Sequence, residues 1–223
     1  MNNRNVQSIF QTSEFNDLNR DDFNNKYKNE SNFRELKELK ELHTQLMQDI
    51  TFPLNNFDYR GNKVDGWSMN EKRGNKTYEP PVGWVGIGLK VLGCFDGGYN
   101  NWIEKNSRDE WCVAYHGISG PKQIIRNIIE KGFKEGRGQF FKDDEDILHP
   151  GQKVGTGVYF TPSIEAAEQY SLPLKFGDYN YKTVLMVRVK PDKIRQSARF
   201  NPYWVVNGDT DEVRPYRILF KKV

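Results

Sequence analysis

Residues 155–160 read Gly-Thr-Gly-Val-Tyr-Phe, and this run indicates the fold more strongly than any other part of the chain. Its last three residues have the β-branched and aromatic side chains typical of a strand. A short helix follows and carries Tyr170, eleven residues beyond Tyr159. Because the two glycines precede a strand, the run differs from the phosphate-binding turn of a Rossmann fold, which lies between a strand and a helix.

Two further segments complete a three-part pattern around this run. Upstream, residues 111–116 read Trp-Cys-Val-Ala-Tyr-His and predict a strand that delivers His116, followed by Gly117. A glycine at that point leaves its backbone amide and carbonyl open to a ligand. Downstream, Tyr203 precedes the predicted strand 204–206.

The remaining elements predict the fold class. Runs of β-branched and aromatic residues also predict strands at 183–189 and 216–220. A helix capped by Ser119 and ending before Gly132 is predicted between the first two strands, with four isoleucines on its buried face (Ile124, Ile125, Ile128 and Ile129). Strands outnumber helices and do not alternate regularly with them, so we expect an α+β domain built on antiparallel sheets.

In their order along the chain, the three segments resemble the signature of the diphtheria-toxin-like ADP-ribosyltransferases of the poly(ADP-ribose) polymerase (PARP) type. The resemblance covers residues 111–223 and is strongest in the first two segments. It implies a PARP-like fold of antiparallel split sheets with few helices, and NAD as co-substrate. By resemblance, His116 bonds the adenosine ribose and Gly117 pairs with the nicotinamide amide. Tyr159 then lines the nicotinamide riboside pocket, and Tyr170 stacks on the nicotinamide ring.

Two positions depart from this signature. Ala167 stands where the family often has a serine that bonds the nicotinamide carboxamide, and one lost neutral hydrogen bond weakens binding by roughly tenfold. By resemblance, the three catalytic positions are His116, Tyr159 and Tyr203. The third of these positions is usually acidic in the family. A tyrosine with a pKa near 10 is a poor general base at neutral pH, so chain elongation is not expected. Glu212 is the alternative acid if this register is wrong, although residues 209–212 are also typical of a turn.

The resemblance therefore implies an NAD-dependent mono-ADP-ribosyltransferase, a glycosyltransferase of the pentosyl-transfer type, that passes one ADP-ribose to an unidentified protein acceptor. The alternative is a catalytically inactive PARP-like fold that serves as a structural or protein-binding subunit of a larger assembly. The polar stretch 134–154 takes the place of the family's donor-site loop. Its charges are explained either by contacts at the site or by a solvated loop.

The residues before this region fall into three parts. Residues 1–30 are rich in Asn and predict an arm, either mobile or docked on a partner. Residues 31–52 have apolar side chains at three- and four-residue steps and predict an amphipathic helix that packs across the main domain or contacts a partner helix. The transferase-like domain is expected to span 66–223. Its Gly-, Pro- and Trp-rich block 66–102 includes a strand at 84–91, with a partner-binding aromatic platform as the alternative.

Charge, targeting signals and the number of Cys and His residues bear on the partners, the compartment and metal binding. The net charge of +3, from 33 basic and 30 acidic residues, argues against a nucleic-acid partner. The absence of a signal peptide or apolar span predicts an intracellular protein, cytoplasmic or nuclear, and allows association with the cytoskeleton. The two cysteines (Cys94 and Cys112) and three histidines (His43, His116 and His149) lack zinc-ligand spacing, so we expect no metal and two buried thiols.

Overall fold

A computed structural model describes residues 37, 41, 42, 44, 45, 54–58, 71–199 and 202–223 of the 223-residue chain. The arm expected at 1–30 lies outside the described residues, as does most of the helix expected at 31–52. In the unit Met1–Glu41, the two described residues, Lys37 and Glu41, are helical. In the unit Leu42–Val223, Leu42 is helical and buried.

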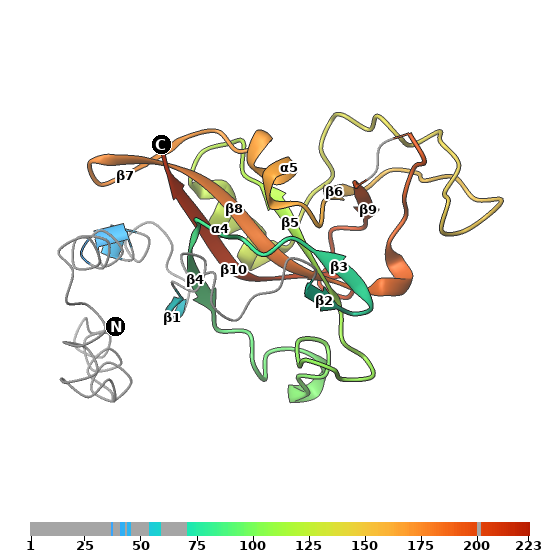
Figure 1. The fold of residues 1–223 in the computed structure, drawn as a ribbon, viewed down its shortest axis with the longest axis horizontal. Helices are drawn as coiled ribbons and strands as arrows, with labels where there is room; N and C mark the ends of the chain where they lie inside the picture. Colours follow the sequence, from blue (N-terminus) through green and yellow to red (C-terminus); the bar gives the residue numbers. More distant parts are fainter. Residues whose placement is uncertain (1–36, 38–40, 43, 46–53, 59–70, 200–201) are drawn as a thin grey trace. The chain divides into compact units, whose positions relative to one another are not determined.

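The unit Leu42–Val223 has a mixed α+β fold with mostly antiparallel strands and few helices, which confirms the expected fold class. Its main sheet has the order β1-β4-β10-β8-β5, with β7 paired to β8. Every pairing in this sheet is antiparallel. Figure 1 shows the long strands β8 and β10 crossing the middle of the domain. The bounds are β1 Leu54–Asp58, β4 Val85–Leu89, β5 Cys112–Gly117, β7 Leu174–Phe176, β8 Tyr179–Val189 and β10 Val213–Lys222.

Two further sheets have two strands each: β2 (Glu71–Arg73) with β3 (Lys76–Tyr78), and β6 (Val158–Phe160) with β9 (Trp204–Val206). The β6–β9 pair joins the main sheet through a bridge between Tyr115 of β5 and Thr161. Each of these two residues donates its amide to the other's carbonyl, at 2.8 and 3.1 Å. The strands predicted to carry His116, Tyr159 and Tyr203 are therefore adjacent in the fold.

Two further α-helices have bounds within the described residues, α4 (Gln123–Lys131) and α5 (Ile164–Gln169). The N-cap of α4 is Lys122 rather than the predicted Ser119, because the chain becomes helical only from Gln123. Gly132 ends α4 as predicted, with φ at +78°. The hydroxyl of Ser163 caps α5 by accepting from the Ala166 amide.

Side chains alternate across β5, and this separates the two helices. Tyr115 packs in the core cluster that contains Ile164 and Ala167 of α5. His116 points to the other face, where its ring meets Phe133 just after α4. The two helices thus cover opposite faces of β5, with the strand edge at Gly117 between them.

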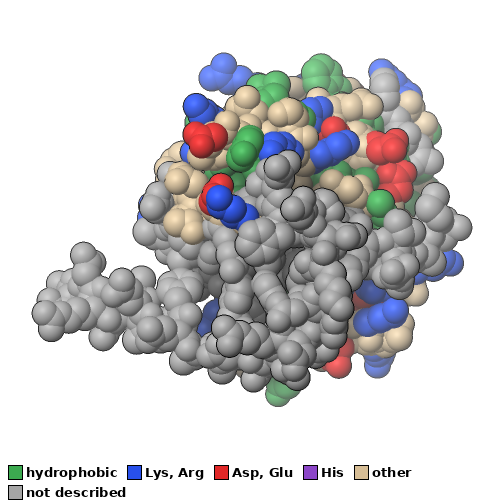
Figure 2. All heavy atoms as spheres, turned by 60° about the vertical axis from the view of Figure 1, so that its left-hand side comes forward, with side chains coloured by type: hydrophobic (Ala, Val, Ile, Leu, Met, Phe, Trp, Pro, Cys, Tyr) green, Lys and Arg blue, Asp and Glu red, His purple; other side chains and the backbone are tan. Residues whose placement is uncertain are grey.

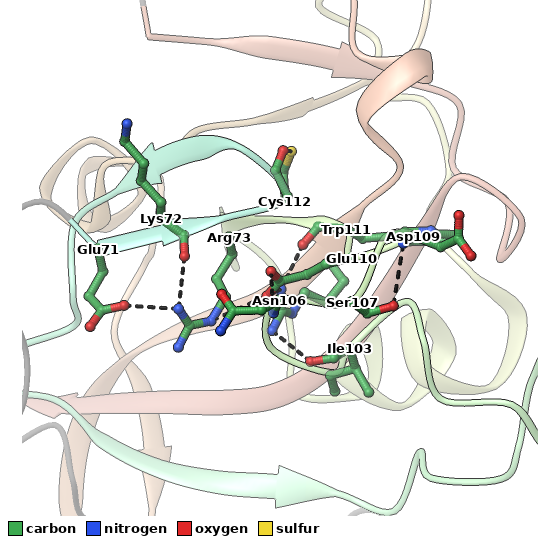
Figure 3. Close-up of polar contacts among 12 residues, drawn as sticks. Glu71, Lys72, Arg73, Ile103, Asn106, Ser107, Asp109, Glu110, Trp111 and Cys112 are labelled. Carbon is green, nitrogen blue, oxygen red and sulfur yellow. Dashed lines mark hydrogen bonds and ion pairs between the residues drawn. The ribbon is translucent and has the colours of Figure 1, made fainter.

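A buried ionic network ties the β2–β3 hairpin to β8 and the segment before β5. Glu110 accepts from Arg188 at 3.2 Å and from the Asn106 amide at 3.1 Å, and it lies 3.4 Å from the Arg73 guanidinium. Arg188 also donates to the carbonyl oxygen of Trp111 at 2.6 Å. Figure 3 shows Glu110 among these contacts. Glu110 and Arg188 are both buried, so removing Glu110 would leave the Arg188 guanidinium in the core without the carboxylate that it pairs with.

The predicted burial of both thiols is wrong for one of them. Cys112 is buried and donates its Sγ–H to the Gly74 carbonyl, whereas Cys94 is exposed. On the described part of the face in Figure 2, basic and acidic side chains are interspersed with hydrophobic ones. No helix among the described residues is long and apolar enough to cross a bilayer.

Candidate functional site

His116 lies at the end of β5 with its ring fixed by one hydrogen bond. Its Nδ1 is 2.9 Å from the Tyr159 carbonyl oxygen. A carbonyl oxygen only accepts, so Nδ1 carries the proton and Nε2 keeps its lone pair for a ligand. Phe133 and Phe160 pack around the ring, and burial lowers the pKa of His116 below its usual value, opposed by the bond to Tyr159. The ring is therefore neutral at pH 7 and presents an acceptor.

Gly117 presents backbone groups at the strand edge. The Ile118 amide bonds the Thr183 carbonyl of β8, so the neighbouring pair Gly117–Val184 is a non-hydrogen-bonded pair of this ladder. The amide and carbonyl of Gly117 then face away from β8, on the edge where Tyr115 bonds Thr161. One donor and one acceptor side by side match the two groups of a carboxamide.

A side chain cannot be accommodated at Gly117. A Cβ there would lie 2.2 Å from the Ala167 carbonyl oxygen and 3.0 Å from the Tyr170 carbonyl carbon. Glycine is thus required for the close approach of α5 to β5, in addition to any ligand contact. This approach brings Tyr170, the C-cap residue of α5, beside the strand edge.

Tyr159 occupies the middle of β6, opposite Val205 of β9. Its hydroxyl accepts from the Phe141 amide at 3.3 Å, and the two rings meet edge to face. Its ring packs against a small cluster formed by Phe141, Val154 and Val205, which also contacts Tyr203. Tyr159 therefore joins β5, through its carbonyl, to the segment that follows α4.

The two remaining tyrosines of the pattern contact each other. The rings of Tyr170 and Tyr203 lie edge to face with centroids 5.9 Å apart. The Tyr170 side chain is 59% exposed, which leaves room for a planar ring on it. Burial and the hydrogen bond to Tyr170 raise the pKa of Tyr203 to about 12.

A cavity of about 480 Å³ opens beside His116 on the α4 side of β5. Apolar side chains form most of its wall, and the charged side chains that line it are those of Lys131 and Lys134. Neither Tyr170 nor Tyr203 lines this cavity, so the site has two parts that meet at Gly117. The lining residues are His116, Gly117, Ile118, Ser119, Ile124, Asn127, Ile128, Lys131, Gly132, Phe133, Lys134, Gly136, Val158 and Tyr159.

Two carboxylates of the acidic stretch between α4 and β6 are bound to other parts of the protein, although neighbouring residues of the stretch are exposed. Asp146 is buried and accepts from the amides of Leu148 and Gln196 and lies 2.6 Å from His149 Nδ1. Burial would raise the pKa of Asp146, but these hydrogen bonds outweigh it and lower the pKa. Asp144 accepts from Ser197 and Arg199. The segment is therefore fastened to residues 196–199.

Glu212 is committed to a structural contact. Its carboxylate accepts from both the backbone amide and the side-chain amide of Asn207, at 3.1 and 2.9 Å. Residues 209–212 form a turn in which Val213 and Glu212 donate to the Asp209 carbonyl. Glu212, the alternative to Tyr203 as the third catalytic residue, is thus hydrogen-bonded to the residue that follows β9.

Several residues around the site were missed by the sequence reasoning. Asn127 and Lys131 line the cavity, whereas the sequence analysis singles out only the isoleucines of α4. Lys134, which also lines the cavity, belongs to the polar stretch 134–154 considered for the site. Gln139 bonds both the amide and the carbonyl of Gly157, each at 3.0 Å, and so holds the segment after α4 against β6. Asn127 and Lys131 are four residues apart, so they lie on one polar face of the predicted helix. This spacing could have identified them as candidate site residues.

Comparison with known proteins adds no family assignment. No family model matches the sequence, and no curated protein matches it significantly. Within the described residues, no group of three or more His, Cys, Asp or Glu side chains is arranged to hold a metal ion.

Proposed function

We propose that the chain is a PARP-like mono-ADP-ribosyltransferase that uses NAD as co-substrate and a protein side chain as acceptor. The observation that carries the proposal is the arrangement around Gly117. The backbone edge at Gly117, with one donor and one acceptor, lies beside the His116 acceptor and close to the backbone of Tyr170, an exposed tyrosine. Such a site suits a ligand that has an aromatic carboxamide at one end and a ribose hydroxyl a short distance away.

In the proposal, the edge at Gly117 and Tyr170 binds one end of NAD, and the cavity beside His116 binds the other end. In the proposal, the carboxamide of nicotinamide pairs with Gly117 and its ring stacks on Tyr170. The adenosine lies in the cavity beside α4, where His116 Nε2 accepts from a ribose hydroxyl and the isoleucines contact the base. Lys131 and Lys134 supply positive charge for the pyrophosphate.

The proposed reaction breaks the bond between nicotinamide and C1′ of its ribose. The bonding electrons leave with nicotinamide, C1′ passes through an oxocarbenium-like state, and the acceptor nucleophile forms the new bond to C1′ and releases its proton. Positioning supplies most of the rate enhancement in this scheme. Tyr203 stays protonated at neutral pH, so it does not activate a ribose hydroxyl for a second transfer, and the product carries one ADP-ribose.

The test uses the intact chain with NAD labelled on the adenylate. Self-labelling, nicotinamide release and transfer to added acceptor protein are measured for the wild type, His116→Ala and the surface control Arg126→Ala. Arg126 pairs with Glu130 on α4 and does not line the cavity. We expect activity in the wild type and control and at least a tenfold loss in His116→Ala. Absence of all three activities in the wild type, with NAD failing to bind, would refute the proposal.

A second function is favoured by the Tyr170–Tyr203 contact. A tyrosine packed against the stacking ring is compatible with a PARP-like fold retained as a protein-binding subunit without catalysis. Calorimetric titration with NAD and nicotinamide separates the two functions. Binding of both ligands that is weakened in Tyr170→Ala supports the transferase, whereas a wild type that binds neither supports the subunit.

A further inference from the structure

Arg195 joins three segments that converge on the β6–β9 pair. Its backbone amide and carbonyl exchange hydrogen bonds with Val205 of β9, at 3.0 and 2.8 Å. Its side chain donates through Nη1 to the Val154 carbonyl at 2.7 Å and through Nη2 to Asn207 Oδ1 at 3.0 Å. Arg195 thus holds the segment before β6 against the middle of β9 and the residue that follows β9.

The guanidinium lies where the two glycines of the Gly-Thr-Gly run leave space. A Cβ at Gly155 would be 3.0 Å from Arg195 Nη1, and one at Gly157 would be 2.9 Å from Nη2. Gly155 also has φ at +68°, in the region that favours glycine. The glycines that precede β6 therefore make room for an arginine from the segment that bridges to β9 at Val205.

Asn207 in turn is held by Glu212, which accepts from both its amides. The chain of contacts runs from Glu212 through Asn207 to Arg195 and on to Val154. A planar guanidinium suits this task because its donors point in fixed directions toward two acceptors.

We infer that Arg195 is a positioning residue for the site: it sets the place of β6, and through the Tyr159 carbonyl it fixes the orientation and tautomer of His116. The guanidinium acts on β6 from the side where that strand begins: its Nη1 holds the Val154 carbonyl, four residues before β6, and Tyr159 of β6 accepts the Nδ1–H of His116. Val205 lies opposite Tyr159, and its two bonds to Arg195 are backbone bonds, which an alanine at residue 195 retains. The consequence for NAD rests on the proposed function, whereas the effect on His116 does not.

The experiment follows the two ring nitrogens of His116 by ¹⁵N NMR in the full chain, with the signals assigned by their loss in His116→Gln. The variants are Arg195→Ala, Arg195→Lys and the surface control Arg126→Ala. His149, whose Nδ1 is bound to Asp146, serves as an internal reference for the fold. Thermal unfolding of each variant is recorded in parallel, together with NAD affinity.

In the wild type and in Arg126→Ala, we expect a protonated Nδ1 and an unprotonated Nε2 on His116. In Arg195→Ala, the two nitrogen signals should move toward each other as the tautomers mix, while those of His149 stay in place. Low millimolar methylguanidine should restore the wild-type signals in Arg195→Ala but not in Arg195→Lys, since lysine fills the site with a single ammonium. The NAD dissociation constant should rise about tenfold in Arg195→Ala, which corresponds to loss of about one hydrogen bond.

Unchanged His116 signals in a folded Arg195→Ala overturn the inference. If that variant does not fold, Asn207→Ala removes one of the two side-chain contacts, and it must shift the His116 signals in the same direction by a smaller amount. Unchanged signals there also overturn the inference. A wild type that does not bind NAD refutes the proposed function instead, and the His116 signals still decide the role of Arg195.

Discussion

Tyr170 and Tyr203 meet edge to face in the protein, with ring centroids 5.9 Å apart. The contact joins the end of α5 to the residue that precedes β9. It places a neutral phenol beside the Tyr170 ring. The charge at this point of the site is therefore set by a group whose pKa is about 12.

Tyr203 should contribute no ionisation to catalysis near neutral pH. Because the pKa of its hydroxyl is raised to about 12, the group stays protonated from pH 6 to pH 9. We expect Tyr203→Phe to retain NAD cleavage within about tenfold, the range of one neutral hydrogen bond, with an unchanged pH profile. Nicotinamide release measured across this pH range tests the expectation. A basic limb that vanishes in Tyr203→Phe would contradict it.

Tyr170 should stabilise bound nicotinamide through its ring rather than its hydroxyl. Stacking of aromatic rings contributes about 0.5–1.5 kcal/mol beyond area burial, so Tyr170→Ala should weaken nicotinamide binding about two- to tenfold. Tyr170→Phe keeps the ring and should bind like the wild type. Tyr99, which is 71% exposed and does not line the cavity, supplies the control Tyr99→Ala. Equal affinities for Tyr170→Ala and Tyr99→Ala, measured by calorimetry, would be inconsistent with stacking.

A methyl group at residue 157 should destabilise the fold. Its Cβ would lie 2.7 Å from Val205 Cγ1 and 2.8 Å from the Val206 carbonyl oxygen, closer than packed atoms approach. We expect Gly157→Ala to lower the free energy of unfolding by about 1–3 kcal/mol. Gly136→Ala is the matched control, because no atom lies within 4 Å of its Cβ position. Urea denaturation that ranks the two variants equally would show that the β6–β9 contact tolerates the methyl group.

Asp146 should make stability depend on pH in the acid range. Its pKa is lowered in the folded protein, so its contribution is complete above the unfolded pKa of about 3.9 and is lost as pH falls through the lower folded value. Asp146→Asn should therefore cost about 1–3 kcal/mol at pH 7, and this difference should shrink below about pH 4. Urea denaturation at several pH values provides the measurement. A difference that persists unchanged down to pH 2 would argue against a paired carboxylate.

Residue type was sufficient to predict the strands that carry the candidate site. Residues 111–116, 157–160 and 204–206 are β-branched or aromatic runs, and β5, β6 and β9 form there. The β2–β3 hairpin was missed because β2 consists of three charged residues and β3 is only three residues long. Its turn, Gly74–Asn75, has positive φ at both positions and was the local signal that could have revealed it.

Contacts between distant residues set the parts that were not predictable. Asp144 and Asp146 occur in a run of acids that is typical of a solvated loop. Their partners are Ser197 and the Gln196 amide, about fifty residues further along the chain. Likewise, nothing in the local sequence of Arg195 relates it to Val154. The neighbours of such side chains depend on the tertiary fold, which no periodicity encodes.

Because the two cysteines differ in burial, one of them can be labelled selectively with a fluorescent dye. Burial raises the pKa of Cys112 to about 11, so its thiol stays protonated and shielded at pH 7, whereas Cys94 faces solvent. A maleimide fluorophore should therefore attach at one position in the unmutated chain, which mass spectrometry after digestion can verify. Since neither cysteine lines the cavity beside His116, the dye would report ligand titrations by anisotropy without occupying the site.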